Sequence, residues 1–307
     1  MEEYVKGPAP DRWHWINSCT QYPREAVQKR SSRPNADLCD ECLDIEKRSQ
    51  IRSVLSRYKE VAEIMSRNIV TIAPEASMAQ AARIMGEKHI GSLIVTKYET
   101  PVGIVTERDL LSKVLVFEKN LREEKVEAVM SYPLIAISPV AKIKEAAKMM
   151  SQKKGRLAVF DVGKLVGIVT ASDLIRSLPD VPETEVKVDD FMTKNVETAD
   201  EKTPVISVAK MMGEKRIGSV IITSKGEPSG IFSERDLLTA FLVESKPLIS
   251  EVGKEASFPL ITAPIGTSVH EAAVTMSIKH IRRLPIIGAG RMVGIITARD
   301  LVEAYAK

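Results

Sequence analysis

Cysteine and tryptophan are missing from most of this chain. Of its 307 residues only three are cysteine and two are tryptophan, and all five lie within the first 42 residues. The absence of cysteine from residue 61 onward excludes disulfides and cysteine nucleophiles from about four fifths of the protein. Residues 1–60 therefore form an element distinct in composition from the rest, and the length predicts about two further domains.

Long apolar runs and a strong net charge are also lacking. No stretch is apolar enough to span a bilayer, and the first residues lack a signal-peptide pattern, so we expect a cytoplasmic protein without a membrane partner. The chain has 44 Lys and Arg against 41 Asp and Glu, a formal net charge of +3. Because the positive and negative charges nearly cancel, bulk electrostatics does not indicate binding to nucleic acid or to a membrane. Any anion site must be local.

A repeat of about 64 residues organises the chain from residue 61 onward. A Gly-apolar-apolar-Thr/Ser motif, followed three residues later by Asp, begins at Gly103, Gly167, Gly230 and Gly294. Upstream of each motif, apolar residues spaced i, i+3, i+4, i+7 predict a helix with one buried face. These helices cover residues 78–85, 143–150, 205–212 and 269–276. We expect an α/β (α+β) protein whose repeats each run strand, helix, strand, strand, helix.

Repeat 1 resembles repeat 3 more closely than it resembles repeat 2. Five residues of repeat 1 recur in repeat 3 with a displacement of 127: Met65, Asn68, Gly86, Gly91 and Glu107 become Met192, Asn195, Gly213, Gly218 and Glu234. This pattern predicts that a two-repeat module was duplicated whole. The expected modules are 61–180, with repeats 61–118 and 126–180, and 186–306, with repeats 186–245 and 249–306. A linker begins at Leu178.

Each repeat brings a hydroxyl and a carboxylate to the point where a strand ends and a helix begins. One interpretation is a capping box that satisfies the first helix amides without any ligand. The other is a binding site, because these amides favour a phosphate and the carboxylate accepts ribose hydroxyls. Four copies at nearly constant spacing favour the binding site. The pairs are Thr106 with Asp109, Thr170 with Asp173, Ser233 with Asp236, and Thr297 with Asp300.

Arginines accompany these pairs. Arg108, Arg235 and Arg299 directly precede an aspartate, and Arg156, Arg282 and Arg283 lie where a helix gives way to the next strand. Arginine offers forked donors that fit phosphate. The neighbouring lysines are interpreted instead as residues that stabilise the last helical turn by interacting with the helix dipole. We predict that the arginines contact an anionic ligand.

Residues 61 to 306 resemble four cystathionine-β-synthase (CBS) motifs arranged as two Bateman modules, and the registered Gly-apolar-apolar-Thr-x-x-Asp signature carries the likeness. The resemblance implies small three-stranded sheets paired about a pseudo-twofold axis, with two clefts per module for AMP, ADP, ATP, NAD or S-adenosylmethionine. It assigns ribose to the four aspartates, ribose or phosphate to the four hydroxyls, and phosphate to the arginines. It also implies that the first strands line the adenine, near residues 70–72, 135–137, 197–198 and 261–262.

The repeats depart from this pattern unequally. Repeat 2 has Ala171 and Ser172 where repeats 1 and 3 have Glu-Arg, so its cleft has one phosphate donor fewer. Repeats 1 and 3 carry Gly-Ser where repeats 2 and 4 carry arginine. We therefore expect no more than two or three strongly occupied clefts.

The N-terminal element carries a set of metal-ligand residues. Cys39 and Cys42 have the spacing of a zinc knuckle, with Cys19 favoured as a third ligand over His14 as a fourth. So short a polar segment buries little core without a metal. The alternatives are an iron-sulfur cluster on the three thiolates, or a reduced cysteine pair at the start of a helix over about residues 43–58.

Two functions follow from these observations. The first is a regulatory protein that senses an adenine nucleotide or other adenosyl ligand and signals to an unidentified protein, with the chain as a monomer or a homodimer. The alternative is a nucleic-acid-binding or transcriptional regulator that uses the zinc element, with the modules as its sensor. Residues 1–60 carry 11 Lys and Arg against 10 Asp and Glu, which counts against this alternative. We expect no enzymatic activity, because no nucleophile with a partnered base and no P-loop is present.

Overall fold

The structure is a computed structural model that describes residues 4–7, 12–16, 19, 21–23, 28–31, 34, 38–46, 59–153, 155–178, 186–239 and 247–307. The described residues up to Lys59 form a smaller compact unit, and Glu60–Leu178 with the residues from 186 onward form a larger one. Most of the linker predicted after Leu178 and most of the helix predicted over 43–58 lie outside the described residues. Within the described part of the chain, no helix is long and apolar enough to cross a membrane.

The larger unit contains four three-stranded sheets, one for each repeat. A short first strand lies beside a hairpin of two longer ones in every sheet. The strands are β3 (Thr71–Ile72), β4 (Ser92–Lys97) and β5 (Thr100–Thr106); β6 (Ala136–Ile137), β7 (Leu157–Asp161) and β8 (Lys164–Val169); β9 (Thr198–Asp200), β10 (Ser219–Ser224) and β11 (Glu227–Ser233); β12 (Ala263–Pro264), β13 (Arg283–Gly288) and β14 (Arg291–Thr297). The predicted order of elements is confirmed, although the first strand of repeat 4 begins at Ala263 instead of residue 261.

Helices join and follow these strands. The four amphipathic helices lie where the apolar spacing predicts them: α3 (Met78–Glu87), α6 (Ile143–Lys153), α8 (Val205–Glu214) and α10 (Val269–Ile278). A second set begins directly after the third strand of each sheet: α4 (Glu107–Leu110), continued by a π-helical turn η1 (Leu111–Leu115), α7 (Ala171–Ser177), α9 (Glu234–Asp236) and α11 (Ala298–Ala306). Short helical segments precede the first strands: α2 (Val61–Ile64), α5 (Val126–Val129), η3 (Val188–Asp190) and η5 (Val252–Lys254).

All four sheets have the same strand order and equivalent register at the end of the third strand. The first strand runs parallel to the central strand, which pairs antiparallel with the third, so Ser92 lies opposite Thr106 and Arg283 opposite Thr297. Each hairpin shifts register once, as between Val95 and Thr96. Such a bulge bends and twists the strand locally. The Ser or Thr of each motif is thus the last residue of the third strand or the residue after it, next to the start of the helix.

Chain segments exchanged between neighbouring repeats hold each module together. Ser66, ahead of the first strand of repeat 1, forms a bridge with Ile168 of repeat 2, and Thr193 of repeat 3 forms the equivalent bridge with Ile295 of repeat 4. A Cβ at Gly167 would lie 2.5 Å from Met65 Sδ, and one at Gly294 would lie 2.5 Å from Met192 Sδ. The motif glycine is therefore required because a side chain of the partner repeat crosses directly over the strand: a methionine at Gly103, Gly167 and Gly294, and Phe258 at Gly230.

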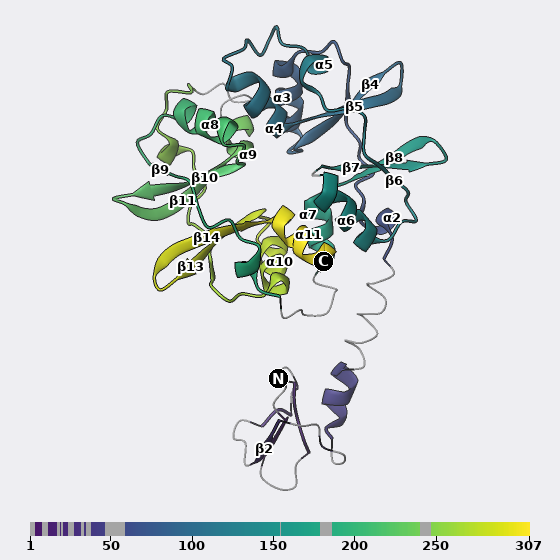
Figure 1. Cartoon of the computed structure of the whole chain (residues 1–307), viewed down its shortest axis with the longest axis vertical. Helices are drawn as coiled ribbons and strands as arrows, with labels where there is room; N and C mark the ends of the chain where they lie inside the picture. Colours follow the sequence, from purple (N-terminus) through teal and green to yellow (C-terminus); the bar gives the residue numbers. More distant parts are fainter. Residues whose placement is uncertain are drawn as a thin grey trace. The chain divides into compact units, whose positions relative to one another are not determined.

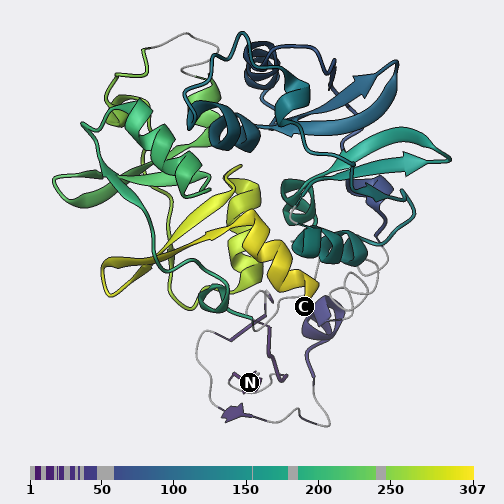
Figure 2. The same ribbon diagram turned by 45° about the horizontal axis from the view of Figure 1, so that its top comes forward.

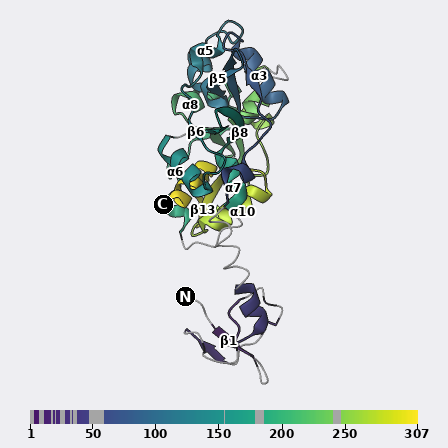
Figure 3. The ribbon, with the colours of Figure 1, turned by 90° about the vertical axis from the view of Figure 1, so that its right-hand side faces the viewer.

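Helices join the two modules. Repeats 1 and 3 share one apolar core, in which Met85 and Met212 are fully buried, and α8 packs on η1. Repeats 2 and 4 meet where α11 packs on α6 and α10 packs on α7. Figures 1 and 2 show the result for the larger unit, a ring of four repeats with the β4–β5 and β7–β8 hairpins on one side and the β10–β11 and β13–β14 hairpins on the other. Figure 3 shows that this ring is flat when viewed edge-on.

The smaller unit has a two-stranded antiparallel sheet of β1 (Tyr4–Lys6) and β2 (Gln28–Arg30) and a helix over residues 40–46. Bridges from Val5 to His14 and from Trp13 to Leu38 connect its segments. The buried residues among those described in this unit are few: Tyr4, Val5, Gly7, Trp13, His14, Trp15, Cys19, Pro34, Cys39 and Cys42. The cysteines thus make up much of the described core of this unit.

The substitution Gly167→Ala tests the crossing of the partner segment. We expect it to lower the free energy of unfolding by about 1–3 kcal/mol, the usual cost of overpacking, because Met65 must move. Gly288→Ala is the matched control, since its nearest neighbour, Val293 Cγ1, is 3.2 Å from the added carbon. Urea denaturation of both variants measures the difference. Equal stability of the two variants would contradict this explanation of the motif glycine.

Candidate functional site

A central cavity of about 1060 Å³ lies where the four repeats meet. Residues of every repeat line it, among them twelve of the fourteen predicted nucleotide-binding residues: Thr106, Arg108, Asp109, Arg156, Thr170, Asp173, Arg235, Arg282, Arg283, Thr297, Arg299 and Asp300. Ser233 and Asp236, which are also described, do not line it. The structure thus gathers residues that are up to 194 positions apart in sequence, from Thr106 to Asp300, around one space.

The hydroxyl and carboxylate of each motif contact one another in the same way in all four repeats. The backbone N–H of Thr106 donates to Asp109 Oδ2 at 2.9 Å, and its hydroxyl donates to the same oxygen at 2.6 Å. Thr297 and Asp300 repeat the arrangement at 2.8 Å for both contacts. The motif therefore forms a capping box in all four repeats. Only one carboxylate oxygen is used for the cap, so the other oxygen is the group that differs between repeats.

The surroundings of the second oxygen, Oδ1, differ from repeat to repeat. Asp109 Oδ1 lies 2.7 Å from Lys113 Nζ, and Asp173 Oδ1 pairs with Arg176. The hydroxyl of Ser257 approaches Asp236 Oδ1 at 3.5 Å. Within the described residues, Asp300 Oδ1 has no hydrogen-bond partner.

Burial raises the pKa of both Asp236 and Asp300, and their hydrogen bonds to Ser233 and Thr297 act in the opposite direction. The half-buried carboxyl of Asp300 therefore lacks the compensation that a second hydrogen bond at Oδ1 would supply. Asp300 is the aspartate of the four that remains open to a further donor.

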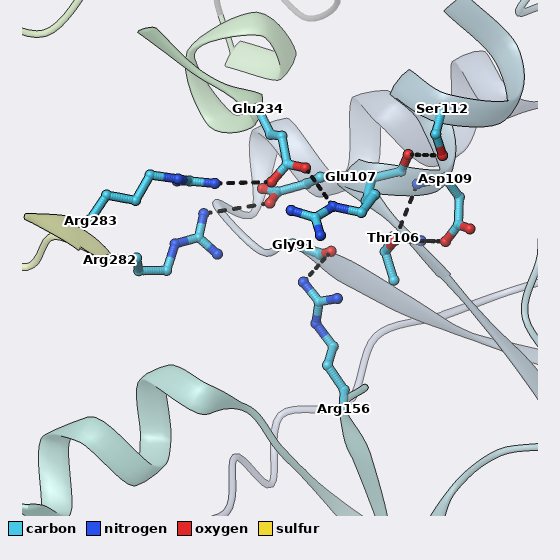
Figure 4. A network of polar contacts seen from close by, with 10 residues as sticks. Gly91, Thr106, Glu107, Asp109, Ser112, Arg156, Glu234, Arg282 and Arg283 are labelled. Carbon is cyan, nitrogen blue, oxygen red and sulfur yellow. Dashed lines mark hydrogen bonds and ion pairs between the residues drawn. The ribbon is translucent and has the colours of Figure 1, made fainter. Parts of the chain in front are cut away.

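Five arginines, Arg108, Arg156, Arg235, Arg282 and Arg283, form a cluster with Glu107 and Glu234 at the centre of the cavity. Figure 4 labels both glutamates together with Arg156, Arg282 and Arg283. Glu107 and Glu234 are only 3% and 7% exposed. Arg282 Nη2 lies 3.5 Å from Glu107 Oε2, and Arg283 Nη2 lies 3.2 Å from Glu234 Oε2. Two further contacts cross from repeat to repeat: Arg108 Nε to Glu234 Oε1 at 3.1 Å, and Arg235 Nε to Glu107 Oε1 at 3.8 Å. Charged side chains of repeats 1, 3 and 4 are therefore held together by these ion pairs.

Arg156 completes the cluster by donating to the carbonyl oxygen of Gly91 at 2.8 Å. A Cβ at Gly91 would lie 2.8 Å from Arg156 Nη2, and one at Gly218 would lie 2.0 Å from Arg283 Nη2. Glycine in the odd repeats therefore makes room for arginine from the even repeats. Burial lowers the pKa of Arg156 and Arg283, while the nearby glutamates oppose that change. Arginine stays protonated at neutral pH regardless.

Glu107 and Glu234 are absent from the set of site residues predicted by sequence. Their recurrence with a displacement of 127 was a usable signal, since repeats 2 and 4 carry Ala171 and Ala298 at that place. Acidic residues are not expected to line an anion site, so the motif pattern gave no reason to select them. Only the structure shows that they contact the arginines.

The N-terminal unit brings together all four predicted metal-ligand residues: His14, Cys19, Cys39 and Cys42 are buried, with ligand atoms within 4.8 Å of one another. Cys19 Sγ lies 3.6 Å from His14 Nδ1 and 3.8 Å from Cys39 Sγ, and Cys42 Sγ lies 3.8 Å from His14 Nδ1. Ligand atoms around a tetrahedral zinc are separated by about 3.5–3.8 Å. His14 and Cys19 therefore both lie within reach of a metal ion held by Cys39 and Cys42. Burial raises the pKa of the Cys19 thiol to about 12.

Comparison with known proteins decides the family. The CBS domain model matches residues 61–116, 126–180, 188–243 and 249–307. The chain belongs to the CBS domain family. The predicted fold of tandem CBS motifs with small three-stranded sheets is thereby confirmed.

The chain is also similar to individual proteins. The chain is 27% identical over 266 residues to the uncharacterized protein MJ1404 of Methanocaldococcus jannaschii, covering 80% of this chain and 62% of that protein. It is similar in structure to protein MJ1225 of the same organism (TM-score 0.69, 24% identity, 80% of this chain and all of that one). An uncharacterized conserved protein from Pyrococcus horikoshii also matches (TM-score 0.58, 25% identity, 80% and 100% coverage). The chain spans about three fifths of the length of MJ1404.

The substitution Arg283→Ala tests whether the central cluster contributes to stability. It leaves the buried Glu234 with Arg108 as its remaining arginine contact, and we expect a loss of about 1–3 kcal/mol in the free energy of unfolding. Arg291→Ala, at an exposed strand end, is the matched control and should change stability by less than about 0.5 kcal/mol. Chemical denaturation gives both values. A stabilised Arg283→Ala variant would show that the desolvation cost of the cluster exceeds its attraction.

Proposed function

We propose that the larger unit binds an adenine nucleotide or another adenosyl ligand in its central cavity and regulates a partner protein through the packing of its modules. The observation that carries this proposal is the cavity itself, where Ser/Thr–Asp pairs suited to ribose open onto five arginines suited to phosphate. CBS domain proteins are in general regulatory. Protein MJ1225, similar in fold, has been proposed as an archaeal homologue of γ-AMPK.

The proposed clefts are unequal. Each proposed cleft lies between the aspartate of one repeat and the segment that precedes the first strand of the neighbouring repeat. In the cleft of Asp300 this is the segment from Thr193 to Glu197. The cleft of Asp236 does not open on the cavity, and Ser257 stands against that carboxylate. In the clefts of Asp109 and Asp173 a basic side chain occupies Oδ1. We therefore propose at most three occupied clefts, with that of Asp300 the most open to ribose.

We propose in addition that the N-terminal unit holds one zinc ion on His14, Cys19, Cys39 and Cys42. Three thiolates with one imidazole form a common structural zinc set, and the distances given above suit a tetrahedral centre. The ion would tie residues 14–19 to the start of the helix at residue 40 and so supply stability that a core of this size lacks. The four protein ligands would leave no open position, so its role is structural.

A signalling role follows if the ligand binds two packings of the modules with different affinity, since only differential affinity shifts an equilibrium. The partner is a protein contacted by the module surface or the N-terminal unit, and we place the process in the cytoplasm. The nucleic-acid-binding alternative is not favoured, because residues 1–60 are nearly neutral. A catalytic role is not proposed.

Thermal shift measurements test nucleotide binding. A ligand at about 100 times its dissociation constant stabilises by about 2.7 kcal/mol, which raises the Tm of a domain of this size by roughly 5–10 °C. We expect such a rise with at least one of AMP, ADP, ATP, NAD and S-adenosylmethionine, and a smaller one for the Asp300→Ala variant. Asp161→Ala, at an exposed hairpin end, is the control and should respond like the wild type. No rise with any of the five ligands would overturn the proposal.

Metal analysis tests the zinc proposal. The purified chain should contain about one zinc ion per molecule, and the double variant Cys39→Ser, Cys42→Ser should contain almost none. Ser112→Ala, outside this unit, is a control that should retain the metal. Iron in place of zinc, or equal zinc contents in the double variant and the wild type, would contradict the assignment.

A further inference from the structure

We propose that Glu107 and Glu234 are internal anions that hold the cavity arginines until the phosphates of a bound nucleotide replace them, so that these two glutamates set how many phosphates the cavity accepts. This inference rests on the proposed nucleotide-binding function. It assigns a specificity-determining role to two residues that carry the wrong charge for a phosphate site.

The position of the two carboxylates supports this role. Both are almost completely buried, and each lies against two arginines, Glu107 against Arg235 and Arg282 and Glu234 against Arg108 and Arg283. Carboxylate and phosphate oxygens use the same guanidinium donors with similar geometry. A phosphate that enters the cavity must therefore share these donors with the glutamates or take their place.

The cluster is nearly symmetric between the two modules, whose equivalent residues are 127 positions apart. Glu107 is equivalent to Glu234, Arg108 to Arg235, and Arg156 to Arg283. The exception is Arg282, whose counterpart is Gly155. Five arginines against two glutamates leave a formal excess of three positive charges. This excess attracts one phosphate without displacing either glutamate, whereas each further phosphate brings negative charge closer to two buried carboxylates.

The same contacts connect the two modules. Arg108 belongs to repeat 1 and contacts Glu234 of repeat 3, while Arg235 of repeat 3 contacts Glu107 of repeat 1. A phosphate that takes over Arg108 or Arg235 therefore opens a contact between modules. Ligand binding in one module thus changes the ligand affinity of the other module, and this coupling must be reciprocal.

Isothermal titration of the full chain with adenosine, AMP, ADP and ATP tests this inference. The variants are Glu107→Gln and Glu234→Gln, in which the amide keeps the shape of the side chain and removes its charge. Glu145→Gln, on the exposed side of α6, is the matched control. We expect each cavity variant to bind ATP roughly tenfold more tightly than the wild type, the value of one charge-assisted hydrogen bond. The gain should be smaller for AMP, and absent for adenosine and for the control.

The remaining outcomes distinguish failure of this inference from failure of the proposed nucleotide-binding function. Unchanged or weakened ATP binding by both cavity variants, or an equal gain for adenosine and ATP, would overturn the role of the glutamates while leaving nucleotide binding intact. If wild type binds none of the four ligands but the variants bind ATP, the glutamates block the site, which supports the inference. If neither wild type nor variants bind, both proposals fail. Circular dichroism of each variant checks that it is folded.

Discussion

Burial of helix faces between repeats is the constraint on which the rest of the larger unit depends. A sheet of three short strands with two helices has too little interior to bury its own apolar residues. Met85 of repeat 1 and Met212 of repeat 3 are buried in one shared core, and α11 covers α6 across the other module contact. Four repeats packed in this way form a ring, and the helix start of each repeat is carried to its centre.

The central cavity follows from that packing. Every third strand ends at, or one residue before, a Ser or Thr that caps the following helix. Three of the four aspartates paired with these hydroxyls, Asp109, Asp173 and Asp300, line the same cavity. The capping and binding interpretations of the motif then describe two uses of the same residues. Oδ2 of each aspartate caps its own helix, and Oδ1 is left for a neighbour or a ligand.

The two buried glutamates of the cavity are compensated by arginines from other repeats. Glu107 and Glu234 follow the motif hydroxyl directly, and their buried carboxylates are compensated by arginines that reach across the ring. Buried ion pairs are costly to form, because both partners lose their water. Such a cluster is therefore sensitive to any anion that offers the arginines a better partner, which suits a protein that responds to a ligand.

The sequence by itself determined the repeat, the order of its elements and the residues that cap its helices, because these depend on periodicity and on contacts three or four residues apart. The helix over Val205–Glu214 and the Thr297–Asp300 cap are examples. It also placed the four metal-ligand residues within one short segment. Only the tertiary structure decided that Arg156 needs Gly91, that Met65 needs Gly167, and that Glu107 faces Arg282, 175 residues away. These contacts form between repeats, and the packing of repeats is not encoded in any local pattern.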